Sequence, residues 1–118
     1  MDIYTQFYDS ILNNDIKNFK ILLNNKEIDP SEADNWAIRV ASMKGYLRIV
    51  KLLLNDKRIN PSDEKNQTIC FAYDKGFLNI VDLLWQDQRV KDTLKNDDIN
   101  LYNELIQKDK IKNKVESF

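Results

Sequence analysis

Few residues in this chain of 118 could carry chemistry. Cys70 is the single cysteine, and a thiol becomes a strong nucleophile only where a neighbouring base or cation lowers its pKa. The sequence contains no histidine, which excludes a Cys-His pair, a Ser-His-Asp triad and a histidine metal ligand. We therefore interpret Cys70 as a half-buried thiol without a catalytic role.

Two pairs of adjacent acids, Asp63-Glu64 and Asp97-Asp98, could supply acid–base chemistry. Both stand before apolar helical patterns, where carboxylates cap a helix or stabilise its first turn, so we interpret them as caps and solvated charges. No group of acids has the spacing of a calcium-binding loop. The two glycines leave no glycine-rich phosphate loop. The sequence predicts a protein that is not an enzyme and that needs no metal or cofactor.

The two glycines belong to a repeat, and this repeat must position every other residue. Residues 41–54 return as residues 72–85 without a gap, 31 residues later. The linking segments keep the same offset, since residues 28–31 and 59–62 both begin with isoleucine and contain proline followed by serine. An ungapped repeat of this length predicts stacked helical units, because no unit can bury its apolar face alone.

Each unit is predicted to consist of a turn, a short helix, a tight turn and a second helix. Proline removes a backbone donor and disfavours helix in the preceding residue, so helices should stop before Pro30 and Pro61. Gly45 and Gly76 should end the first helices in the left-handed conformation. Asn14 holds the equivalent position of a degenerate first copy.

Side-chain caps are expected at the start of the first helices. Asp34 or Asn35 should cap the helix that carries Ile38, and Asn66 should cap the helix that carries Ile69. These residue types accept hydrogen bonds from the free N–H groups of a helix N-terminus.

The chain is predicted to form one all-α domain. Residues 1–27 form the degenerate N-terminal unit, residues 28–58 and 59–89 form two clear repeats, and residues 90–118 form a helical cap with a basic tail. The last helix should begin at Asp97 or Asp98 and extend over about residues 98–109. Its expected apolar stripe is residues 99, 102 and 106, with leucines 101 and 105 beside it.

The composition of the chain indicates its cellular compartment and which kinds of partner it can attract. The formal net charge is −1, so no overall field attracts nucleic acid or an acidic membrane. No apolar run reaches the roughly 18 residues of a membrane-spanning helix, and the first residues lack the pattern of a signal peptide. One cysteine suits a reducing compartment. The prediction is an intracellular, cytoplasmic protein without membrane contact.

The second half of each unit resembles the ankyrin repeat. The family pattern Gly-His-Leu-x-Ile-Val-x-Leu-Leu-Leu stands as Gly-Tyr-Leu-Arg-Ile-Val-Lys-Leu-Leu-Leu at residues 45–54 and as Gly-Phe-Leu-Asn-Ile-Val-Asp-Leu-Leu-Trp at residues 76–85. The family opening Thr-Pro-Leu-His-x-Ala keeps its apolar and alanine positions at residues 36–41 and 67–72. The period of 31 is shorter than the usual value of about 33. The linkers and the closing residues 101–106 resemble short ankyrin-type proteins of giant DNA viruses and amoebae.

This resemblance implies an ankyrin-type helical solenoid with short turns that binds a partner protein through its concave face. For a viral protein the partner would be a host protein and the location the host cytoplasm. Family contact positions lie at turn tips and on the exposed face of each first helix. They match Tyr8, Glu32, Asn35, Trp36, Arg39, Met43, Lys44, Glu64, Asn66, Cys70, Tyr73, Asp74 and Lys75.

Alternatives stay open for the function and for single residues. Three units leave large end faces, so self-assembly through these ends is one alternative, and both a monomer and a weak homodimer are compatible with the sequence. The lysines of the tail could contact nucleic acid, although a few like charges usually form a solvated terminus. Trp36 could instead pack over the neighbouring unit, and Arg39 could pair with Asp34. Trp85 is expected in the core or the cap.

Overall fold

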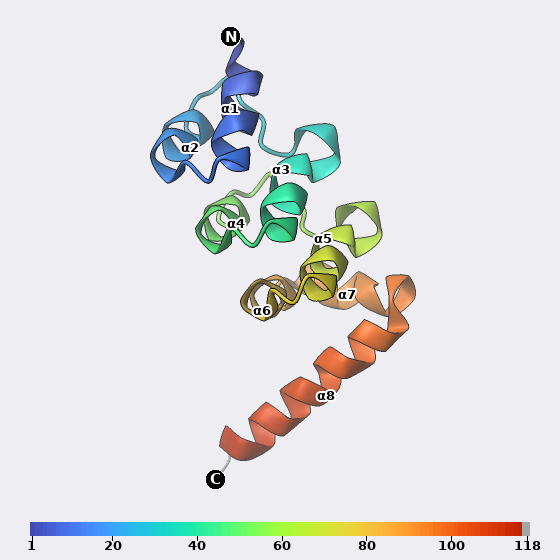
Figure 1. Cartoon of the computed structure of the whole chain (residues 1–118). Coiled ribbons are helices and arrows are strands. Elements are labelled where there is room, and N and C mark those ends of the chain that lie inside the picture. The colour runs from blue at the N-terminus through green and yellow to red at the C-terminus, as the bar shows by residue number, and fades with distance from the viewer. Residues whose placement is uncertain (117–118) are drawn as a thin grey trace.

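The helices follow one another in pairs along the chain. The computed structural model describes residues 1–116, which form eight α-helices and no strand (Figure 1). The all-α prediction is confirmed, and the last two residues of the predicted cap lie outside the described residues. The helices are α1 (Ile3–Leu12), α2 (Ile16–Leu23), α3 (Glu32–Met43), α4 (Leu47–Leu54), α5 (Asp63–Asp74), α6 (Leu78–Trp85), α7 (Gln88–Asp97) and α8 (Ile99–Glu116).

The first six helices form three stacked pairs. Within the pairs α1 packs on α2, α3 on α4 and α5 on α6, and each first helix also contacts the first helix of the next pair. Figure 1 shows α2, α4 and α6 as a second column beside α1, α3 and α5. The molecule extends 52 Å along its longest axis and 29 and 24 Å along the others. Both the stacked pairs and α8, which continues away from the third pair in Figure 1, contribute to this length.

One residue in the left-handed conformation lies between the first and second helix of each pair, as the sequence predicts. Asn14, Gly45 and Gly76 have φ angles of 53°, 77° and 79°. Gly45 is required for a second reason, because a Cβ there would lie 2.8 Å from a ring carbon of Phe77 in the next pair. No atom lies within 4 Å of a Cβ built on Gly76.

The apolar positions of the repeat form the core between the two columns. Val50, Leu53, Val81 and Leu84 are at most 1% exposed, which agrees with their predicted packing. Trp85 is 2% exposed, and its indole Nε1 donates a 2.7 Å hydrogen bond to Asp109 of α8. It therefore belongs to the core and cap, as predicted.

A second set of contacts joins the linkers between pairs. Arg58 Nη1 donates to the carbonyl oxygen of Ile28, and Arg89 Nη1 donates to that of Ile59, both at 2.9 Å. Each guanidinium is also bonded to both carboxylate oxygens of the acid two residues earlier, at 2.7–3.0 Å. These acids are Asp56 and Asp87. Each arginine thus ties one linker to the preceding linker.

The predicted caps of α3 and α5 are wrong. Neither helix has a side-chain cap, and each begins with three consecutive residues in the left-handed region, 33–35 and 64–66. The side chain of Asn35 is turned to the next pair, where Nδ2 donates to Asp63 Oδ2 and Oδ1 accepts from Asn60 N, both at 2.9 Å. The neighbouring layer supplies partners that local sequence rules cannot place.

The C-terminal segment differs from the prediction in three respects. Residues 88–97 form the separate helix α7. Helix α8 begins as expected, with Asp98 Oδ1 accepting from Leu101 N at 3.0 Å, but it continues to Glu116 rather than ending near residue 109. Its buried residues are Leu101 and Leu105, while Ile99 is 45% exposed. Packing against the end of the stack therefore selects a different helix face from the predicted stripe.

Among residues 1–116, no helix combines the length and the apolar character needed to cross a bilayer.

Candidate partner-binding surface

The predicted contact residues are carried by the first helix of each pair or lie directly beside it. Tyr8 is on α1, while the others belong to α3, α5 and the residues that end these helices. Because α1, α3 and α5 are stacked, the equivalent positions of successive pairs form rows along the long axis (Figure 1).

An aromatic contact joins the first two pairs. The ring centroids of Tyr8 and Trp36 are 4.7 Å apart, with the rings tilted by 62°, and Tyr4 lies 5.9 Å from Tyr8. All three side chains are only partly buried. Burial and then the charge of Glu32 raise the pKa of Tyr8, so the Glu32 carboxylate lies near these rings. Trp36 thus packs over the neighbouring pair and still presents part of its ring.

Arg39 is engaged with the turn before its own helix. Its Nη1 donates a 2.8 Å hydrogen bond to the backbone carbonyl oxygen of Asp34, rather than pairing with the carboxylate as one alternative proposed. Asp34 is one of the left-handed residues of this turn. Arg39 therefore stabilises the turn, and its side chain is only partly buried.

Asn35 and Asn66 are buried, being 6% and 0% exposed. Asn66 Nδ2 donates to Thr93 Oγ1 at 2.8 Å and to Asp97 Oδ2 at 2.7 Å. Both asparagines therefore join layers of the stack. Their side chains are therefore buried between layers rather than presented on the surface.

Cys70 is half-buried, as predicted. Burial, with smaller effects of Asp98 and Asp74, raises the pKa of its thiol to about 11. Its Sγ lies 3.9 Å from Asp98 Oδ2. At neutral pH this side chain is a protonated thiol and a weak nucleophile.

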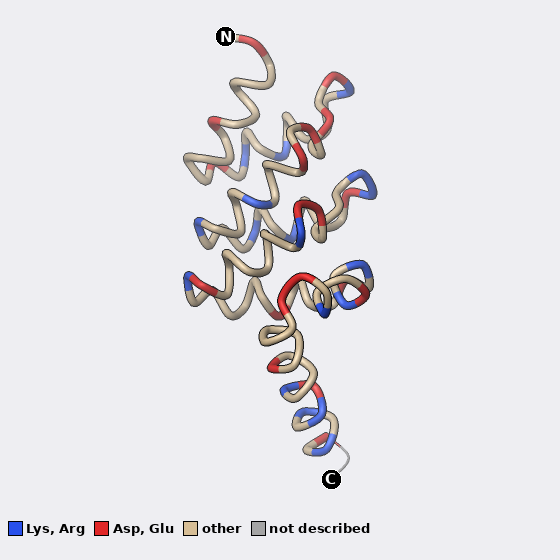
Figure 2. The backbone as a smooth tube through the Cα atoms, turned by 90° about the vertical axis from the view of Figure 1, so that its right-hand side faces the viewer, with Lys and Arg blue, Asp and Glu red and all other residues tan. Residues whose placement is uncertain are grey.

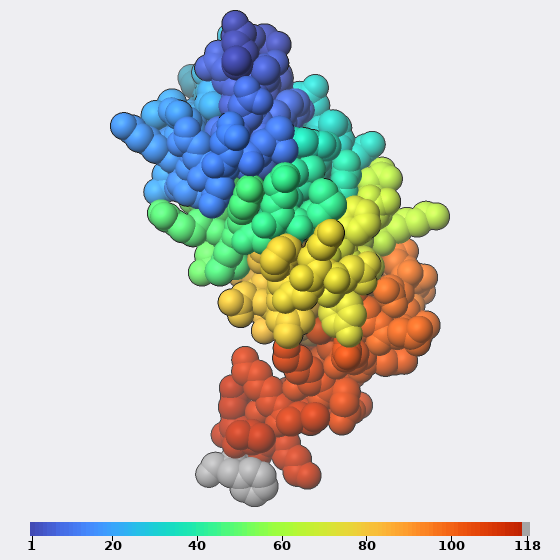
Figure 3. Space-filling model, in the orientation of Figure 1, coloured from blue at the N-terminus to red at the C-terminus, as the bar shows by residue number. Residues whose placement is uncertain are grey.

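Tyr73 borders an apolar groove. It is 37% exposed, and a hydrogen bond with Glu104, then the charge of that residue, raises its pKa. Together with Leu78, Leu105 and Ile111 it lines a groove of about 480 Å³ between the third pair and α8 (Figure 3). In the second pair the equivalent residue of Tyr73 is Ser42, which is fully buried.

The other predicted residues are mostly exposed. Met43 is half-buried. The exposed charged residues of the prediction are Glu32, Lys44, Glu64, Asp74 and Lys75.

Sequence reasoning missed a row of acids along the stack. Figure 2 shows acidic residues at three successive turns, one after another along the long axis. Two bonds show that these turns are neighbours, since Asn35 reaches Asp63 and Asn66 reaches Asp97. We define the acidic row as Glu32, Asp34, Asp63, Glu64, Asp97 and Asp98. The offset of 31 between Glu32 and Asp63 was a signal, but the sequence alone suggested only separate helix caps.

Comparison of this chain with protein-family models, with curated proteins and with solved structures finds no match. The fold and this surface define an all-α protein of stacked helix pairs with aromatic and charged side chains along its first helices. Within residues 1–116, no three cysteine, aspartate or glutamate side chains are grouped closely enough to hold a metal ion.

Proposed function

We propose that this chain is an ankyrin-type repeat protein that binds a partner protein, without catalysis, through the side formed by α1, α3, α5 and their preceding turns. The observation that carries the proposal is the contact of Tyr8 with Trp36 across two pairs, with both rings partly exposed. Tyrosine, tryptophan and arginine contribute most of the binding energy in protein interfaces. A stack of repeats also offers an extended surface for a partner.

The ankyrin-type assignment rests on the sequence repeat together with its helix pairs. Segments 31 residues apart in the chain form equivalent helices in successive pairs. Asn14, Gly45 and Gly76 make the same left-handed turn between first and second helices. The proposed contact surface contains Tyr8, Trp36, Arg39 and Tyr73, with the exposed charged residues around them.

A capture experiment with two matched variants tests this function. The surface variant combines Trp36→Ala, Arg39→Ala and Tyr73→Ala. The control variant combines Lys20→Ala, Arg48→Ala and Asn79→Ala, at exposed positions of α2, α4 and α6.

Far-UV circular dichroism first establishes that both variants are folded. We expect a protein captured from cell lysate by the wild type and by the control variant to be lost by the surface variant. Equal capture by all three proteins would move the binding site to the second column, the ends or α8.

Self-association is the second candidate, and exposed apolar residues at both ends favour it. Leu12 and Ile21 are 40% and 61% exposed in the first pair, and Leu78 is 51% exposed beside the groove. A mass that rises with protein concentration, and that Ile21→Asn returns to the monomer value, would support this function. The nucleic-acid alternative has less support, because Lys108 pairs with Asp82 at 3.1 Å and the acidic row would repel phosphate.

A further inference from the structure

The groove between the third pair and α8 exposes apolar surface at positions that the other pairs cover. Ile11 of the first pair and Ser42 of the second pair are 0% exposed, whereas their repeat equivalent in the third pair, Tyr73, is 37% exposed. Leu78 in the same groove is 51% exposed. The repeat position is thus buried in two layers and open in the third.

Helix α8 extends this apolar surface toward its C-terminal end. Ile111 lines the groove and is 56% exposed, and Val115 is 66% exposed. Residues four apart lie on the same side of a helix, so both side chains belong to the groove side of α8. Together with Tyr73 and Leu78 they form one exposed apolar patch that is shared by α8 and the third pair.

Three acids surround the end of the groove where α8 begins. Asp74, Asp98 and Glu104 line a hollow of about 330 Å³, and this hollow adjoins the groove because Tyr73 and Glu104 line both. Asp98 also caps α8. Among residues 1–116, none of these three carboxylates takes part in an ion pair.

The other end of the groove is basic. Residues 108–116 contain four lysines and two acids, and Figure 2 shows the change from acidic to mostly basic residues along α8. Lys108 lines the groove and is paired with Asp82 at 3.1 Å. Lys112, one turn later, is exposed. The surface around the apolar patch is therefore acidic at one end and basic at the other.

We propose that a second copy of this chain covers the groove, in a twofold dimer in which the two α8 helices are antiparallel. A surface with acids at one end and bases at the other is complementary to itself after a rotation by 180°, and a twofold dimer pairs the same patch of both copies. The basic end of each copy then lies over the acidic end of the other, and the apolar patches meet between them. This inference does not rest on partner binding. It gives the self-association considered above a surface at α8 rather than at the first pair.

The spacing along α8 indicates which residues meet. With the twofold axis near Lys108, Glu104 and Lys112 lie about 6 Å to either side of the axis, so Glu104 of one copy lies opposite Lys112 of the second copy. The same register places Ile111 of the second copy opposite Leu105, which lines the groove. The two Lys108 side chains near the axis are each paired within their own copy. Exposed charge pairs contribute little energy, so the apolar patch provides most of the affinity and the charges select the orientation.

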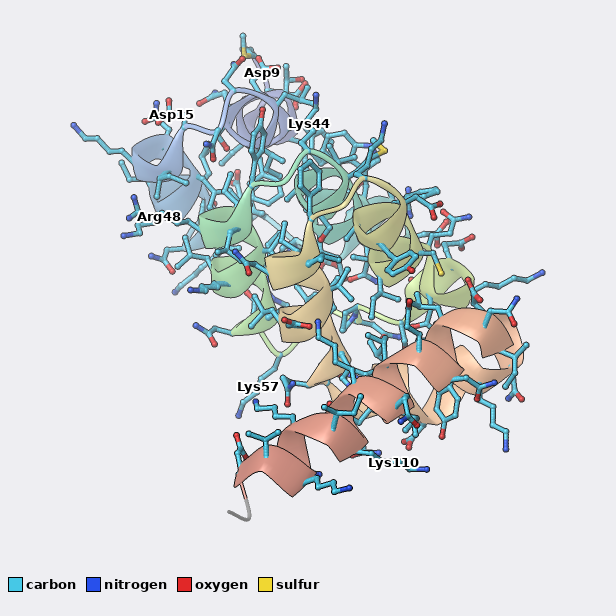
Figure 4. All side chains as sticks on the ribbon, turned by 60° about the horizontal axis from the view of Figure 1, so that its bottom comes forward. Asp9, Asp15, Lys44, Arg48, Lys57 and Lys110 are labelled. Carbon is cyan, nitrogen blue, oxygen red and sulfur yellow. The ribbon has the colours of Figure 1, made fainter. Side chains whose placement is uncertain are left out.

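Sedimentation velocity of the full chain over a range of concentrations tests the dimer. Two variants test its orientation, since Glu104→Lys makes both ends of the surface basic and Lys112→Glu makes both ends acidic. Lys110→Glu is the matched control, because Lys110 does not line the groove and lies on the outer side of α8 (Figure 4). Ile111→Asn tests the apolar patch at an exposed position. Thermal melts followed by circular dichroism confirm that each variant is folded.

We expect the mass of the wild type and of Lys110→Glu to rise with concentration from 14.0 kDa toward twice that value. Glu104→Lys and Lys112→Glu should each weaken association about tenfold, because a twofold dimer makes the altered contact twice. An equal mixture of these two variants should associate again, since every charge contact across the mixed dimer then joins opposite charges. Ile111→Asn should weaken association about a hundredfold, because one apolar contact is lost from each copy.

Three outcomes overturn the inference. These are a mass that stays at 14.0 kDa up to about 1 mM protein, a mixture that associates no better than its two components, and association that Ile21→Asn abolishes and Ile111→Asn does not. A monomeric wild type whose captured protein is lost in Ile111→Asn would assign the groove to a different partner. None of the dimer variants changes Trp36 or Arg39, so the capture experiment tests the proposed function separately.

Discussion

Replacing Asn35 should destabilise the fold more than any loss of an exposed contact, because its buried amide joins two layers. The side chain is 6% exposed, donates to Asp63 Oδ2 and accepts from Asn60 N. A hydrogen bond to a charged group contributes about 1.5–3 kcal/mol, and a buried donor left unpaired costs about 1–3 kcal/mol. Since Asn60 is half-buried and water can reach it, we expect about 2–4 kcal/mol from these two losses.

The backbone of Asn35 allows the hydrogen bonds to be separated from strain. Its φ angle is 60°, where glycine is unstrained and alanine costs about 1–2 kcal/mol. Asn35→Gly should therefore lose only the side-chain bonds, and Asn35→Ala should be less stable by about a further 1 kcal/mol. Against a total stability of about 5–15 kcal/mol, either loss is large.

Urea unfolding followed by far-UV circular dichroism measures these changes as shifts of the midpoint at constant m-value. A double-mutant cycle with Asp63→Asn isolates the coupling between Asn35 and Asp63. An Asn35→Gly variant within about 0.5 kcal/mol of the wild type would refute the reasoning, because that is the range of ordinary surface substitutions.

Three further predictions use the same unfolding assay. Ser42→Ala should leave the stability unchanged or raise it by about 1 kcal/mol, because the buried hydroxyl of Ser42 has no hydrogen-bond partner. Gly45→Ala should cost about 1–3 kcal/mol more than Gly76→Ala, because only at Gly45 does the added methyl group meet a ring of the next pair. Asp56 and Asp87 should make stability depend on acid, because hydrogen bonds from their arginine partners are the main cause that lowers the pKa of each below 3.8. Their contribution is present above pH 3.8 and is lost as the pH falls through the lower folded-state pKa.

The results that would contradict these three predictions differ. A Ser42→Ala variant clearly less stable than the wild type would mean that the hydroxyl has a partner. Equal losses for the two glycine variants would mean that the ring moves away without cost. The pH dependence is checked with the double variant Arg58→Gln, Arg89→Gln. Its free energy of unfolding should fall less steeply below pH 3.8 than that of the wild type.

The candidate site was only partly accessible to sequence reasoning. The equivalence of Tyr8, Arg39 and Cys70 follows from the offset of 31, and the structure places all three on first helices. The sequence did not reveal that Asn35 and Asn66 are buried, because asparagine before a helix ordinarily indicates a cap. It also did not reveal the acidic row, since its members are separated along the chain and meet only when the turns stack.

The ends of the stack show the same division. The start of α8 was predicted at Asp97 or Asp98, because capping depends on the next few residues, and Asp98 is the residue that caps the helix. The length of α8 and its buried face were not identified, because Leu101 and Leu105 are selected by contact with the rest of the fold. The side-chain oxygen Oδ1 of Asn66 has no hydrogen-bond partner, and this too depends on the neighbouring layer rather than on the local sequence. Its repeat equivalent Asn35 accepts from residue 60, whereas the N–H of residue 91 is bonded within α7.

The sequence by itself determined the helix pairs, their left-handed turns and most of the core. These features depend on the spacing of apolar residues and on the backbone freedom of Asn14, Gly45 and Gly76, which are local properties. The tertiary structure alone decided which polar residues join the layers, how α8 crosses the end of the stack, and which acids form one surface. Those outcomes depend on distances between segments about 30 residues apart, which stacking fixes and local residue patterns do not.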